Sequence, residues 1–160
     1  MSAIANKIFP KSVTNNFAGH KLALYVFGFV VIFTIVRSFI HILAPDGGAQ
    51  SIAGIPLTTF STEAQSAVIF MFAVWGLSQM LMGIVYAIVL WKYKSLIPLM
   101  YIMIFLEYLL RIVIGHFKPV ETLHTAPGEI GNYILIPLAV VMCYLATRDR
   151  PGKPGTPSHK

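Results

Sequence analysis

Charged residues and cysteines are scarce in this sequence. Only 11% of the 160 residues are Asp, Glu, Lys or Arg, whereas 56% are hydrophobic. A soluble domain of this length exposes much of its chain to water, so it cannot bury such a large hydrophobic fraction. The single cysteine, Cys143, excludes an intramolecular disulfide and any metal site built from several cysteines of one chain. Cys143 lies in an apolar run, where a small hydrophobic side chain is expected.

Motifs of known catalytic chemistry are also missing. The sequence has no Ser or Cys nucleophile in a recognisable motif, no HExxH pair and no glycine-rich phosphate loop. The formal net charge of +6 does not indicate nucleic acid, because the basic residues lie at the ends of apolar runs and not along one helix among aromatics. These absences favour a binding or accessory protein over an enzyme, and no nucleic-acid partner is predicted.

What the sequence does contain is a set of long apolar runs. About 20 apolar residues in a helix cross the hydrocarbon core of a bilayer. We therefore predict an all-α integral membrane four-helix bundle with up-down-up-down order, whose transmembrane domain covers residues 22–146. The predicted spans are residues 22–43, 67–91, 96–114 and 130–146. Residues 1–21 are predicted to be a cytoplasmic segment and residues 147–160 a disordered basic cytoplasmic tail.

The segment between the first two spans has the composition of a loop. Pro45, Asp46, Gly47 and Gly48 prevent this stretch from crossing a bilayer. Its apolar residues between 52 and 60 predict a loop that packs over the mouth of the bundle instead of extending into water.

Orientation follows from the distribution of Lys and Arg, which are retained in the cytoplasm. Basic residues lie in the N-terminal segment, in the short connection after the second span and in the tail. The first long loop has none, and the third connection has only Lys118. We therefore expect both termini to be cytoplasmic, in a multi-pass protein of the cell membrane, with the bacterial inner membrane as the expected location.

Ionisable side chains inside the spans are the strongest functional signal. Such residues are costly in hydrocarbon and usually face the interior of a bundle. Helical spacing puts them at matching depths in spans that run the same way. We predict a polar pocket open to the outer face and lined by these residues, with the two histidines at its rim. The predicted ligand-binding residues are Arg37, His41, Gln79, Glu107, Arg111 and His116.

Several interpretations of these residues stay open. Glu107 can neutralise Arg111, so that the charges only fix helix register in a structural membrane subunit. Alternatively, the arginines bind a small anion, a lipid headgroup or a quinone ring. His41 and His116 are also candidate axial ligands of haem b. Glu107 is a candidate proton carrier in a membrane enzyme or an oligomeric transporter. The sequence predicts no cofactor and no metal. The expected partners are membrane lipids, a second copy of the chain or a membrane complex.

Two short segments carry a resemblance. The sequence GHFKP at 115–119 and the sequence PGEIGNY at 127–133, together with four short spans and a long first outer loop, resemble uncharacterised small bacterial membrane proteins. They are loosely similar to DoxX-type four-helix proteins over residues 22–146. This resemblance implies a redox- or quinone-linked accessory role, and it assigns no functional residue.

Overall fold

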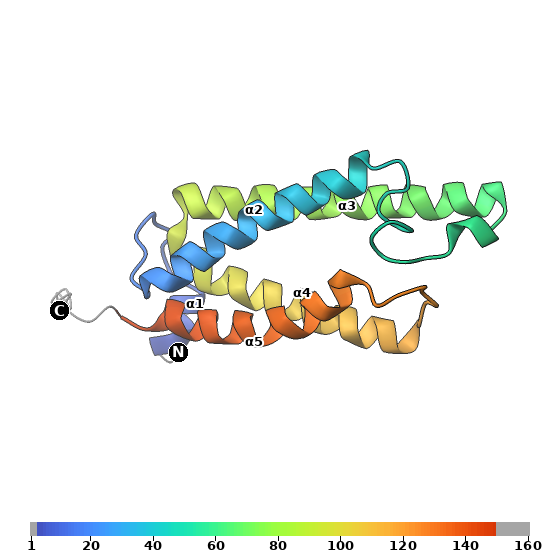
Figure 1. Cartoon of the computed structure of the whole chain (residues 1–160). Coiled ribbons are helices and arrows are strands. Elements are labelled where there is room, and N and C mark those ends of the chain that lie inside the picture. Colours follow the sequence, from blue (N-terminus) through green and yellow to red (C-terminus); the bar gives the residue numbers. More distant parts are fainter. Residues whose placement is uncertain (1–2, 150–160) are drawn as a thin grey trace, which may run out of the picture.

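The computed structural model describes residues 3–149, and these residues form helices and loops without a strand (Figure 1). The prediction of an all-α fold is therefore confirmed for this part of the chain. Four of its helices are long and apolar enough to cross a membrane. The helices are α1 (Ala3–Ile8), α2 (Lys21–Leu43), α3 (Thr62–Lys92), α4 (Ile97–Phe117) and α5 (Pro127–Thr147), with short 3-10 turns at Leu57–Thr59 and Lys94–Leu96.

The ends of the long helices differ from the predicted spans. The helix of the second predicted span, α3, begins at Thr62, before the predicted start at residue 67. The Ser61 hydroxyl caps it by accepting a hydrogen bond from the Ala64 amide at 3.3 Å. The apolar run of the fourth span begins at residue 130, but Pro127 followed by Glu129 predicts an earlier helix start, and α5 does begin at Pro127. Polar helical turns outside an apolar run leave no hydropathy signal.

The short helix α1 was not predicted either. It packs against α4 and α5 at the end of the bundle where the described chain begins and ends. Lys7 fixes it there by donating to the Thr147 carbonyl at 2.9 Å and pairing with Asp149 at 2.7 Å. The predicted disordered tail lies almost entirely outside the described residues.

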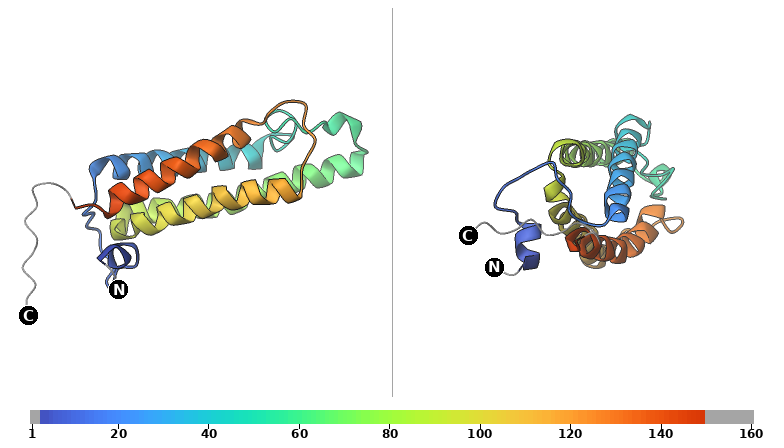
Figure 2. Two further views of the ribbon diagram at one scale, coloured as in Figure 1. Left: turned by 90° about the horizontal axis from the view of Figure 1, so that it is seen from below. Right: turned by 90° about the vertical axis from the view of Figure 1, so that its left-hand side faces the viewer.

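Two antiparallel hairpins make up the bundle. Successive helices run in opposite directions, and α2 packs along α3 while α4 packs along α5 (Figures 1 and 2). Glycines on α3 permit the first pairing. A Cβ at Gly76 would lie 2.7 Å from the His41 Cβ, and one at Gly83 would lie 2.9 Å from the Ile35 Cγ1. Small residues let two helices approach closely, as they do between helices in lipid.

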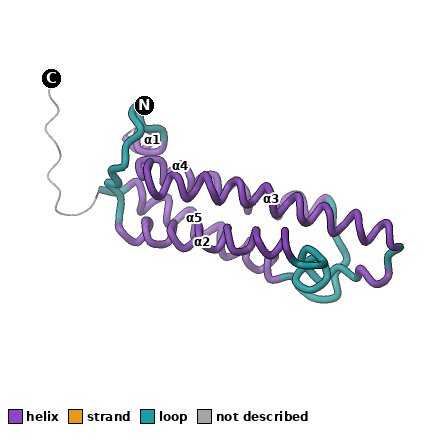
Figure 3. The backbone as a smooth tube through the Cα atoms, turned by 90° about the horizontal axis from the view of Figure 1, so that it is seen from above, coloured by secondary structure: helices purple, strands orange, loops and turns teal. Residues whose placement is uncertain are grey.

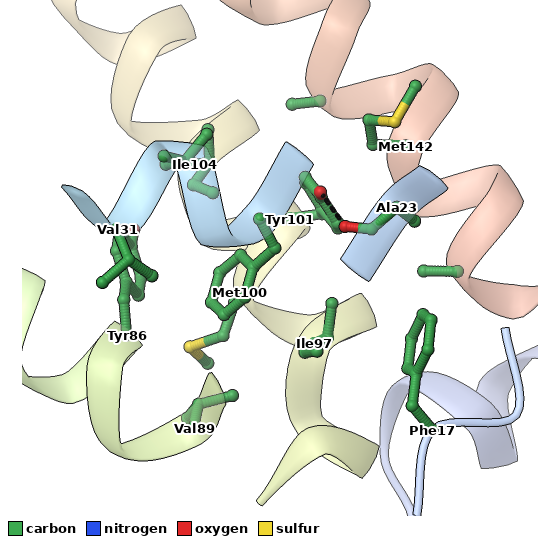
Figure 4. Packing of buried hydrophobic residues seen from close by; sticks show 14 of the residues in the cluster. Phe17, Ala23, Val31, Tyr86, Val89, Ile97, Met100, Tyr101, Ile104 and Met142 are labelled. Carbon is green, nitrogen blue, oxygen red and sulfur yellow. Dashed lines mark hydrogen bonds between the residues drawn. The ribbon is translucent and has the colours of Figure 1, made fainter. Parts of the chain in front are cut away.

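The tightest core lies in the half of the bundle near the described chain ends. Phe27 meets the rings of Tyr86 and Tyr101 edge-on at 5.7 and 5.8 Å between centroids. The Tyr101 hydroxyl donates to the Ala23 carbonyl at 2.6 Å, which joins α4 to the start of α2 (Figure 4). This half holds the two hairpins together.

The other half is more open. The buried residues of α4 end at Tyr108, and those of α5 begin only at Ala139. Beyond these points the two hairpins diverge (Figure 1), and the long loops gather at that end (Figure 3). The polar residues of the candidate site lie in this open half.

The loop after α2 folds back onto the bundle, which is the arrangement predicted from its apolar residues. Leu57 is buried, and Gly47 and Gly48 lie against Phe72 and His41. Both glycines have positive φ angles, of 60° and 77°, which allow the chain to reverse directly after Asp46. The loop therefore forms a cover over one side of the open end.

Candidate functional site

Trp75 of α3 is at the centre of the site. The guanidinium carbon of Arg37 lies 5.7 Å from the centroid of its indole, and that of Arg111 lies 5.0 Å from it. The His41 ring is 4.8 Å from the same indole. Cations within about 6 Å of an indole face are attracted by its quadrupole. One aromatic side chain thus brings together two cationic groups that come from different hairpins.

Arg37 is held by neutral partners. Its Nε donates to the Gln79 Oε1 at 3.0 Å, and its guanidinium also lies 5.8 Å from the Phe33 ring. Within residues 3–149, the ion pairs are Lys7 with Asp149 and Arg111 with Glu107. Arg37 therefore has no carboxylate partner in this part of the chain, although a guanidinium offers five N–H donors.

Glu107 and Arg111 pair with each other along one turn of α4. The pairing follows from their spacing of four residues, which puts both side chains on one face of the helix. The Arg111 guanidinium also lies 5.1 Å from the Tyr108 ring. Glu107 thus compensates one of the two arginines, so the group of three side chains carries one excess positive charge.

His41 departs from its predicted position at the rim. It is only 5% exposed, because the loop after α2 covers it. Its Nδ1 lies 2.8 Å from the Gly47 carbonyl oxygen. A carbonyl can only accept, so Nδ1 carries the hydrogen and Nε2 of the neutral ring is left as an acceptor. His41 is a buried residue beneath a loop and not a rim residue.

Asp46 stabilises the loop that covers His41. Partial burial disfavours its charged form, but the amides of Ser51, Gly48 and Gln50 donate to the carboxylate and lower its pKa to about 2. Asp46 is therefore ionised at neutral pH. The carboxylate of Asp46 accepts its hydrogen bonds from amides of the loop and forms no ion pair with Arg37.

A pocket of about 530 Å³ lies between the hairpins at the open end. We call it the main pocket. Its walls come from α2, α3, α4, α5 and the loop after α2, and most of them are apolar. Its polar residues are Arg37, His41, Arg111, Glu129 and Asn132. Such a pocket can hold an apolar body together with one negatively charged group.

A much smaller cavity, of about 10 Å³, lies deeper between the helices. Gln79, Glu107, Tyr86 and Arg37 are among its lining residues. The Gln79 Nε2 and the Tyr86 hydroxyl are buried and have no hydrogen-bond partner among the described residues. Of these side chains, Arg37 is held by the Gln79 Oε1, and Glu107 is held by Arg111.

The six residues singled out from the sequence are thus divided among neighbouring cavities. Arg37, His41 and Arg111 line the main pocket, and Gln79 and Glu107 lie below it. His116 is exposed and lines a separate cavity, so the two histidines proposed as haem ligands do not line the same one. No cluster of three or more His, Cys, Asp or Glu that fits a metal ion occurs in the described part of the chain.

The sequence pattern predicts Trp75, at helical spacing from Gln79, only as a packing residue, and it does not single out Tyr108 or Phe72. Trp75 contacts both arginines, and Tyr108 contacts Arg111. Phe72 packs on His41 and Trp75. In an apolar span, aromatic residues are normally interpreted as packing residues. The spacing of three between Tyr108 and Arg111 was the available signal, because it puts both on one face of a helix.

Comparison with protein-family models, with curated proteins and with solved structures found no match. The functional argument therefore depends on the geometry and chemistry of the pocket.

Proposed function

We propose that this protein is a multi-pass membrane protein that binds an anionic amphiphile in the main pocket, with Arg37 and Arg111 attracting the anionic group. The amphiphile is a membrane lipid or a lipid-derived molecule with a phosphate or carboxylate. The protein acts as a binding or accessory protein of the bilayer.

The observation that carries this proposal is that Arg37 forms no ion pair within residues 3–149. Arg37 lines an apolar pocket, while the second arginine on the same indole has a carboxylate partner. Unpaired charges are costly in a low-dielectric environment. An anionic group in the pocket compensates this charge, and the planar guanidinium suits phosphate and carboxylate oxygens.

The apolar character of the pocket selects an amphiphile over a small inorganic anion. Its walls include Val36 and Ile40 of α2 and Leu135 of α5. Val36 and Ile40 are also exposed on the surface of the helix, so the apolar wall continues onto the side of the bundle that faces hydrocarbon in a membrane. An acyl chain can pass along this wall, whereas a free anion would leave the apolar surface unused.

Orientation is part of the proposal. Lys7, Lys21, Lys92 and Arg148 belong to the end where the described chain begins and ends, and the loop end carries Lys118. The positive-inside rule then makes the main pocket open toward the outer leaflet. In a Cys143→Ser background, a cysteine introduced by Thr58→Cys, at an exposed position of the loop after α2, should react with a membrane-impermeant thiol reagent added outside intact cells. Reaction only after the cytoplasmic face is opened would overturn this orientation.

Binding can be measured through the fluorescence of Trp75. The chain has two tryptophans, and the second, Trp91, lies at the C-terminal end of α3, away from the main pocket. In a Trp91→Phe variant, Trp75 is the only indole. A single-chain alkyl phosphate with bromine on its chain should quench its fluorescence saturably in detergent micelles. An alkyl maltoside with the same brominated chain, at the same mole fraction, is the matched neutral probe. We expect at least about tenfold weaker quenching from the neutral probe, the effect of losing one charge-assisted hydrogen bond. Equal quenching by both probes would refute binding of an anion.

A further inference from the structure

A second cavity of about 440 Å³ adjoins the main pocket at the loop end of α4 and α5. We call it the side pocket. Three residues line both cavities, namely Arg111, Glu129 and Asn132. The cavities therefore share a wall, and Arg111 borders both of them.

The side pocket has a different chemistry from the main pocket. Besides the shared residues its polar lining is His116, Lys118 and Thr122, all of which are exposed at the loop end, and Ile112, Val120 and Tyr133 add apolar surface. The lining thus combines two cations, Arg111 and Lys118, and the Glu129 carboxylate with neutral groups. A larger share of it is polar than in the main pocket, so of the two cavities the side pocket suits a polar group better.

Acceptors at the shared wall narrow the choice of ligand. The Asn132 Oδ1 is buried and accepts no hydrogen bond from the described residues. Glu129 forms no ion pair within residues 3–149. A buried acceptor without a donor costs free energy, so a ligand group at this wall gains most if it donates hydrogen bonds.

One wall of the side pocket is fixed by contacts between the two long loops. The Leu123 amide donates to the Gly54 carbonyl at 2.8 Å, and the His124 ring lies against Gly54. The loop that carries Lys118 and Thr122 is thereby tied to the loop that covers His41. The side pocket is part of the same folded end as the main pocket.

We propose, on the basis of the proposed function, that the side pocket holds the substituent of a phosphate headgroup, and that this substituent carries hydroxyl groups, as glycerol does. The phosphate lies at Arg111, where the two cavities meet. Hydroxyl groups beyond it donate to the Asn132 Oδ1 and the Glu129 carboxylate, and Lys118 and Thr122 donate to their oxygens. An ammonium substituent also donates, and Glu129 attracts its charge, but the two cations Arg111 and Lys118 outnumber that carboxylate, so the lining as a whole disfavours an ammonium.

Competition against the brominated alkyl phosphate in the Trp91→Phe protein tests this inference. The competitors are an unlabelled alkyl phosphate, lysophosphatidylglycerol and lysophosphatidylethanolamine with chains of one length. We expect lysophosphatidylglycerol to compete about tenfold better than the other two, the effect of one to two additional hydrogen bonds. A variant with Lys118→Gln and Thr122→Val should lose this advantage and still bind the alkyl phosphate.

The possible outcomes separate the two proposals. If the alkyl phosphate competes but lysophosphatidylglycerol has no advantage, or if the double variant keeps the advantage, the side pocket does not bind the headgroup and the main pocket proposal stands. If lysophosphatidylethanolamine competes as well as lysophosphatidylglycerol, the preference for hydroxyl groups is refuted. If the brominated alkyl phosphate itself does not quench Trp75, the proposed function fails.

Discussion

Replacement of Arg37 by Gln is expected to weaken binding of an alkyl phosphate by roughly 10- to 100-fold, because a hydrogen bond to a charged group contributes about 1.5–3 kcal/mol. The amide of Gln is polar but uncharged, so the variant keeps a hydrogen-bonding group and loses the compensating charge. Arg37→Lys should bind at an intermediate affinity, since an ammonium keeps the charge without the planar fork. The measurement is the quenching of Trp75 in the Trp91→Phe background.

Lys21→Gln is the matched control for this experiment. It removes the same charge from the same helix, but Lys21 begins α2 at the far end and does not line the main pocket. We expect its affinity to equal that of the parent protein. If Arg37→Gln folds and binds the alkyl phosphate as tightly as Lys21→Gln does, Arg37 is not an anion-binding residue.

Replacement of Glu107 by Gln is expected to lower the free energy of unfolding more than any other single change at the site. Arg111 would lose its carboxylate partner, so neither arginine of the site would have one in the described chain. Removing one member of a fully buried ion pair costs about 3–5 kcal/mol, and the partial exposure of this pair reduces the expected loss to roughly 2–3 kcal/mol. Thermal and denaturant unfolding of the detergent-solubilised protein measure it.

Two further variants show whether the loss of charge causes the lower stability of Glu107→Gln. His116→Gln changes an exposed side chain, and we expect a change below about 0.5 kcal/mol. The double variant Glu107→Gln with Arg111→Gln removes both charges and should recover part of the loss, because no unpaired guanidinium is then left on α4. A Glu107→Gln protein as stable as His116→Gln would show that Glu107 does not stabilise the site electrostatically.

Much of the fold could be predicted from hydropathy alone. The four apolar runs give four long helices, since an apolar run of this length satisfies its backbone groups best as a helix. The additional first turn of α3 and the short helix α1 could not be predicted in this way. Both depend on individual hydrogen bonds, which the Ser61 hydroxyl accepts and Lys7 donates, and not on an apolar pattern.

The site was predictable where it depends on position along a helix. The spacing of four predicts that Glu107 and Arg111 share a helix face, and they form an ion pair. His41 was misplaced because its burial depends on the path of a loop, which Gly47 and Gly48 turn back over the ring. His116 is separated from His41 because α4 continues to Phe117 and carries it past the main pocket. The path of a loop and the divergence of two hairpins follow from tertiary packing, which hydropathy does not encode.

The most direct test of the account is an experimental structure of the protein in a lipid bilayer disc that contains phosphatidylglycerol. We predict elongated density in the main pocket, passing between α2 and α5, with its polar end at Arg37 and Arg111 and its headgroup in the side pocket. Closed hairpins without bound lipid, with Arg37 and Arg111 turned to opposite outer faces and each reaching separately to lipid headgroups, would contradict it.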